Sequence, residues 1–68
     1  MSHIVLHNDF HPVELDKVMQ DLKDKNIMDA TIMHGNNCIW VSYLSRSSRI
    51  NAYYRFDSNH NLFDIQID

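Results

Sequence analysis

The hydrophobic pattern of this chain changes its period once, at Asn26, and this change limits the folds that the chain can adopt. Before Asn26 the apolar residues recur with the period of a helix that buries one face, at Leu15, Val18, Met19 and Leu22. After Asn26 apolar residues alternate with polar ones, as in half-buried strands. The two periods predict an α+β fold in which one amphipathic helix packs on a sheet.

The predicted helix covers about residues 12–25. Pro12 suits the first turn, because the N–H that it lacks would be unpaired there anyway. His11 or Asp9 is the expected N-cap, and Asn26 is the expected left-handed stop.

Four runs rich in apolar, β-branched and aromatic residues follow, over residues 27–34, 38–45, 49–56 and 62–67. The polar segments between them are short, as in hairpins. They predict an antiparallel β-meander of three to four strands. Residues 4–6 are the candidate for a short N-terminal edge strand. At 68 residues the chain is expected to form a single domain, residues 1–68.

Side-chain alternation predicts which residues oppose each other in the hairpins. A two-residue turn at Gly35-Asn36 opposes Ile32 with Ile39, Ala30 with Val41 and Met28 with Tyr43. In the last hairpin the expected pairs are Phe56 with Phe63, Tyr54 with Ile65, Ala52 with Ile67, Arg55 with Asp64 and Tyr53 with Gln66.

Two orientations of the second strand remain open, because Ser47-Ser48 is a poor two-residue turn. In the favoured one, Trp40 and Leu44 point away from the helix. A longer loop would turn both side chains into the core.

The favoured orientation groups Trp40, Tyr53 and Arg55 on one outward face, with Met33 and Leu44 beside them. Trp, Tyr and Arg are the residue types enriched at the energetic centres of protein interfaces. Arg55 is also placed to lie over Trp40 in a cation–π contact. These five residues are therefore the predicted partner-binding site.

Composition narrows the classes of partner. Nine acidic against six basic residues give a net charge of −3, which argues against nucleic acid, since phosphate binding needs a basic footprint. The one cysteine, Cys38, excludes an intrachain disulfide and predicts a reducing, cytoplasmic location. The sequence shows no signal peptide, and no run approaches the ~20 apolar residues of a membrane span, so no membrane contact is expected.

Histidines are the main candidates for chemistry. His3, His7 and His11 recur every four residues, a spacing compatible with a zinc or nickel site. Structural zinc usually recruits cysteine thiolates, and only Cys38 is available, so we expect no metal and no cofactor. His7, Asp9 and His11 form a candidate acid–base cluster for Cys38, but the chain carries no motif that supports an enzyme.

The sequence thus favours a small cytosolic protein-binding module that acts through the aromatic sheet face or a sheet edge. Its role would be that of an inhibitor, an adaptor or an immunity-type protein, of the kind that phages and other mobile elements encode. We also expect self-association as a homodimer. The alternative is a nucleic-acid-binding module that uses the sheet aromatics with Arg46, Arg49 and Arg55. A metal- or cysteine-dependent enzyme is the third interpretation. The acidic helix residues Asp16, Asp21 and Asp24 are expected to be solvated.

Overall fold

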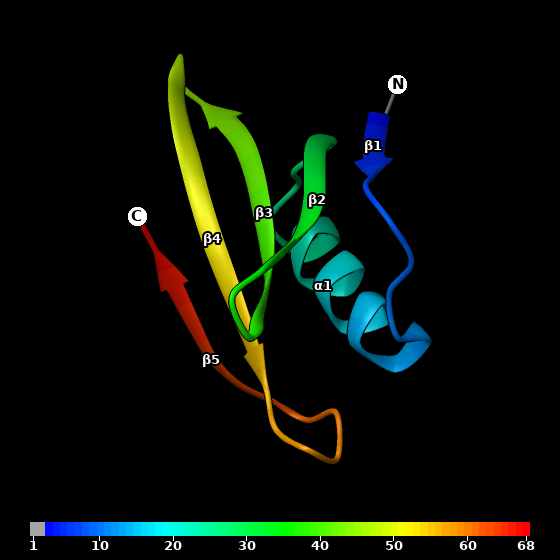
Figure 1. Ribbon diagram of the computed structural model, residues 1–68. Coiled ribbons are helices and arrows are strands. Elements are labelled where there is room, and N and C mark those ends of the chain that lie inside the picture. The colour runs from blue at the N-terminus through cyan, green and yellow to red at the C-terminus, as the bar shows by residue number, and fades with distance from the viewer. Residues whose placement is uncertain (1–2) are drawn as a thin grey trace.

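One helix and five strands make up residues 3–68, the part of the chain that the computed structural model describes (Figure 1). The elements follow the order β1 (His3–Leu6), α1 (Pro12–Asp24), β2 (Asp29–Gly35), β3 (Cys38–Ser45), β4 (Ser48–Phe56) and β5 (Leu62–Ile67). The strands lie in the sheet in chain order, with β2 to β5 antiparallel and β1 parallel to β2 at one edge. The predicted α+β fold, with its N-terminal edge strand, is confirmed.

α1 begins and ends where the sequence predicts. His11 has extended dihedral angles and its Nδ1 accepts a hydrogen bond from the Val13 backbone N–H at 3.3 Å, so it is the N-cap. At the other end Asn26 takes a left-handed φ of 59°. The backbone N–H of Ile27 then donates to the carbonyl of Leu22 at 2.9 Å, which is the Schellman arrangement.

The turn between β2 and β3 differs from the prediction. Asn36 and Asn37 form the turn and Gly35 opposes Cys38, so Ile32 opposes Val41 rather than Ile39. Asn37 takes a φ of 58°, which asparagine tolerates well. The glycine is needed for another reason: a Cβ on Gly35 would lie 2.5 Å from the Sγ of Cys38. The observed pairing of β2 with β3 is shifted by two residues from the predicted one. Because side chains alternate between the two faces, a shift of two leaves every side chain on its predicted face.

The turn between β3 and β4 decides the orientation of Trp40. Arg46 and Ser47 both take positive φ values, 51° and 69°, as in the tight turns that match the twist of a hairpin. Ser45 therefore opposes Ser48, and β4 begins one residue earlier than predicted. Trp40 opposes Tyr53 on the sheet face away from the helix, and the alternative inward orientation is wrong.

The β4–β5 hairpin contains a bulge that the sequence did not predict. The pairs of Tyr53, Tyr54 and Arg55 with β5 are as expected, but the register shifts at Phe56, which opposes Leu62. Phe63 is the extra residue, 60% exposed, and its predicted pairing with Phe56 is wrong. Leu62 packs against the core in its place.

The core lies between one face of the sheet and the stripe of α1. Its buried members are Val18, Leu22, Ala30, Ile32, Ile39, Val41, Ala52 and Tyr54. A helix of 13 residues is about 20 Å long and about 10 Å wide, whereas five strands span roughly 19 Å across. One helix therefore cannot cover this face, and three predicted core residues are largely exposed: Met19 (37%), Met28 (59%) and Ile67 (55%).

The helix is also joined to the sheet by a polar contact. The hydroxyl of the buried Tyr54 donates a hydrogen bond to the carboxylate of Asp21, which also pairs with Lys25 at 2.9 Å. Burial, and then the bond to Asp21, raise the pKa of Tyr54 above its usual range. The expectation that Asp21 is simply solvated is therefore wrong, because Tyr54 reaches it from β4.

Candidate functional site

The sheet face opposite α1 carries an aromatic pair at its centre. Trp40 on β3 opposes Tyr53 on β4, with ring centroids 6.1 Å apart and planes 24° from parallel. The indole Nε1 of Trp40 donates to the Oδ1 of Asn51 at 3.0 Å. Both rings are half-buried, so each offers an apolar surface held in one orientation.

Arg55 borders this pair but does not lie over Trp40 as expected. Its guanidinium lies over the ring of Phe63, 5.7 Å from the centroid, and 4.0 Å from the carboxylate of Asp64. The bulge on β5 brings Phe63 to this position, since an unbroken alternation would have turned its ring toward the helix face. Phe63 is thus a member of the site that the sequence did not indicate.

A shallow hollow lies beside the aromatic pair. It has a volume of about 310 Å³ and is lined by Asn36, Cys38, Tyr53, Arg55 and Gln66. An aromatic wall and a half-exposed guanidinium meet there. The arrangement suits a partner that presents an apolar group next to a carboxylate.

The other two predicted site residues lie on the same face at different distances from its centre. Met33 on β2 opposes Trp40 directly and is half-buried. Leu44 opposes Arg49 near the end of β3, about 13 Å along the strand from Trp40, and is 63% exposed. Leu44 lines a separate hollow of about 580 Å³, where β2 and β3 diverge beyond their last pair, Thr31 and Ser42.

The candidate histidine site is not assembled. Within residues 3–68 no three His, Cys, Asp or Glu side chains are grouped so that they could hold a metal, and His3, His7 and His11 are therefore not brought together. His11 caps α1. Elsewhere the Nε2–H of His34 donates to the backbone carbonyl of Asp9 at 2.7 Å, and its ring stacks on that of Phe10.

Cys38 lies half-buried beside Gly35 at the first position of β3. With Glu14 and His34 it contributes to the lining of a hollow of about 310 Å³ at this end of the molecule. His34 is bonded to the Asp9 carbonyl, and the carboxylate of Glu14 accepts a hydrogen bond from His60. These contacts assign structural roles to both groups.

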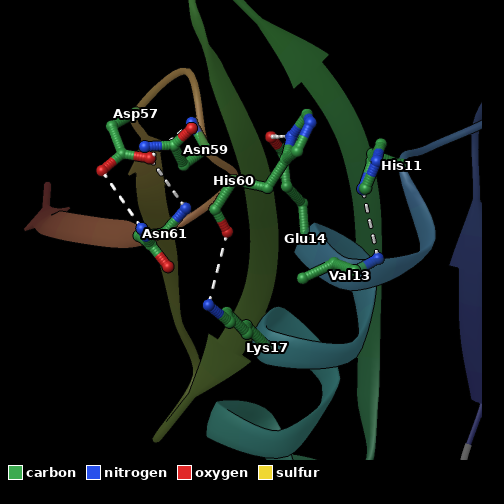
Figure 2. Close-up of polar contacts among 8 residues, drawn as sticks. All are labelled: His11, Val13, Glu14, Lys17, Asp57, Asn59, His60 and Asn61. Atoms are coloured by element: carbon green, nitrogen blue, oxygen red, sulfur yellow. Dashed lines mark hydrogen bonds and ion pairs between the residues drawn. The ribbon is translucent and has the colours of Figure 1, made fainter.

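A second polar cluster fastens the β4–β5 loop to the start of α1 (Figure 2). The Nδ1–H of His60 donates to the carboxylate of Glu14 at 2.7 Å, and the Nζ of Lys17 donates to the backbone carbonyl of His60 at 3.3 Å. The rings of His11 and His60 stack with centroids 3.6 Å apart. Sequence analysis missed this cluster because His60 lies 46 residues after Glu14.

Asp57 stabilises the same loop through hydrogen bonds with the loop backbone. Its carboxylate accepts hydrogen bonds from the backbone N–H groups of Asn59 at 2.8 Å and Asn61 at 2.9 Å (Figure 2). These donors, with Asn61 making the larger contribution, hold the pKa of Asp57 below its usual range. At Asp21 burial acts to raise the pKa, but the bonds from Tyr54 and Lys25 outweigh it, so this pKa is lowered as well.

Acid is expected to destabilise the fold through these two carboxyls. A carboxyl whose pKa is lower in the folded chain contributes stability above its unfolded pKa, about 3.9, and loses it as the pH falls through the folded pKa. Urea denaturation should therefore show a free energy of unfolding that drops as the pH falls below about 4. Asp57→Asn should show a smaller drop than the wild type, and an equal drop would contradict the assignment.

No helix of the described residues is long and apolar enough to span a membrane. Comparisons of this chain with known protein families, with curated proteins and with solved structures found no match.

Proposed function

We propose that this protein is a small cytoplasmic protein-binding module that docks another protein against the outer face of its sheet. One observation carries the proposal: Trp40 and Tyr53 lie side by side on the sheet face opposite α1, with Arg55 at their border. Large aromatic anchors with a neighbouring arginine dominate the binding energy of many protein interfaces. The module would act as an inhibitor, an adaptor or an immunity-type protein, of the kind that phages and other mobile elements encode.

The geometry also supports a particular chemistry for the partner. The indole is already bonded to Asn51 through its one donor, so its ring faces offer apolar contact rather than a hydrogen bond. Arg55 is only weakly paired with Asp64, at 4.0 Å, and both side chains are more than a third exposed. A partner carboxylate can therefore compete for the guanidinium.

Trp40→Ala is expected to weaken partner binding by more than about 2 kcal/mol, which is roughly thirtyfold. The loss follows from removing the largest ring at the centre of the face. Host proteins would be captured on immobilised wild-type protein and identified by mass spectrometry, and the affinity of the purified partner would then be measured by calorimetry. Circular dichroism establishes that the variant is folded.

Val13→Ala is the matched control, because Val13 is an exposed apolar residue on α1, across the sheet from Trp40. It should leave the affinity unchanged. A partner that binds the wild type and the folded Trp40→Ala variant equally would refute this site.

The nucleic-acid alternative has weaker support. Arg46 and Arg49 lie at the β3–β4 turn, whereas Arg55 lies about 20 Å further along β4, next to Asp64. The three arginines thus do not form one basic patch. Salt separates the two functions, because nucleic-acid binding weakens steeply with ionic strength and an aromatic-centred protein contact does not.

A further inference from the structure

β5 forms one edge of the sheet (Figure 1). Within residues 3–68 no further strand pairs with its outer side. Asn51 and Asp68 exchange two backbone hydrogen bonds, Asp68 N–H to Asn51 at 2.8 Å and Asn51 N–H to Asp68 at 3.4 Å. In an antiparallel ladder such pairs alternate, so Gln66 also directs its backbone groups toward β4. The N–H and C=O groups of Ile65 and Ile67 therefore point outward from the edge.

This edge has few of the features that usually prevent strands from pairing with other chains, and Asp64 is the one charged side chain of β5. β5 contains no proline and no lysine, and its bulge is confined to the start of the strand. Its apolar side chains Phe63 and Ile67 are 60% and 55% exposed. β1, at the opposite edge, is only four residues long. β5 is therefore the edge that favours pairing.

We propose that β5 pairs antiparallel with β5 of a second copy of this chain, about a twofold axis perpendicular to the sheet. Such an axis makes the contact self-complementary and joins the two sheets into one, with both helices on the same face. The dimer leaves the outer face around Trp40 open, so it presents two copies of that face. This inference goes beyond the proposed function and does not depend on it.

The positions of the aspartates select one register. With the axis at Ile65, Asp64 lies opposite Gln66 of the partner subunit, a carboxylate against an amide. With the axis at Asp64, the two Asp64 carboxylates oppose each other. With the axis at Gln66, Asp64 opposes Asp68 of the partner subunit. Like charges directly opposite are destabilising, so the axis at Ile65, which avoids a pair of carboxylates, is favoured.

The same register satisfies the outward backbone groups. Ile65 would exchange both hydrogen bonds with Ile65 of the partner subunit, since its N–H and C=O face the edge. At each end the backbone of Ile67 would lie opposite that of Phe63 of the partner subunit, with the Ile67 side chain on the helix face and the Phe63 ring on the outer face. One strand pair buries a small area, so the dimer is expected to be weak and concentration-dependent.

Sedimentation equilibrium across micromolar to millimolar concentration tests the proposal. The wild type should pass from a species of 8.1 kDa to one of twice that mass. Gln66→Lys places a cation opposite Asp64 of the partner subunit twice per dimer and should tighten the dimer on the order of tenfold. Gln66→Asp creates two like-charge pairs and should weaken it on the order of tenfold.

Two further variants sharpen the test. Ile67→Pro removes an outward N–H without removing a bond to β4, so a folded Ile67→Pro should stay monomeric. Leu44→Lys, on an equally exposed residue away from β5, should dimerise as the wild type does. A single 8.1 kDa species throughout, or a dimer insensitive to both Gln66 substitutions, would overturn the proposal. Trp40→Ala should leave the dimer intact, which keeps this test separate from that of the docking face.

Discussion

Tyr54→Ala is expected to lower the free energy of unfolding by about 3–5 kcal/mol, as large-to-small changes of buried aromatic residues do. Tyr54 is the largest of the fully buried side chains, 1% exposed at the centre of the core. A domain of this size rarely has more than about 3–5 kcal/mol of stability in total. We therefore expect Tyr54→Ala to be largely unfolded at 25 °C, as measured by far-UV circular dichroism.

Tyr54→Phe distinguishes the contribution of the buried ring to stability from that of the hydroxyl. The ring stays in the core, but Asp21 loses the hydrogen bond that joins α1 to the sheet. A hydrogen bond to a charged group contributes about 1.5–3 kcal/mol, so the loss should lie in that range. A Tyr54→Phe variant as stable as the wild type in urea would mean that the bond to Asp21 contributes little.

Leu22→Ala is expected to cost about 2–5 kcal/mol, because Leu22 is 1% exposed and lies in the stripe of α1 that faces the sheet. Asp24→Ala is the matched control, since it lies on the exposed side of the same helix and should change stability by less than about 0.5 kcal/mol. Chemical denaturation measures both changes. Equal losses from the two variants would contradict the orientation of α1.

Most of the candidate site was predicted from the sequence. The alternation of β3 and β4 predicted that Trp40, Tyr53 and Arg55 share a face. The tight turn, in which Arg46 and Ser47 take positive φ angles, sets the pairing of β3 with β4 that gives this face. The sequence held no comparable signal for Phe63, because a bulge breaks the alternation on which the prediction depends. Arg55 accordingly contacts Phe63 rather than Trp40.

The sequence by itself determined the elements whose signals are local. The ends of α1 depend on His11 and Asn26, which act within a few residues of themselves. Strand bounds follow from side chains that alternate along one segment, so β3 and β5 begin and end where they were predicted. Local propensity and the burial pattern agree at these positions, and agreement between the two specifies a structure.

Only the tertiary structure decided how these elements meet. A slip of two residues keeps every side chain on its face, so alternation alone could not distinguish the observed pair of Ile32 and Val41 from the predicted one. Tyr54 reaches Asp21 across 33 residues, and His60 reaches Glu14 across 46. Such contacts depend on the position of α1 over the sheet, which packing of the whole core sets and no short segment of sequence encodes.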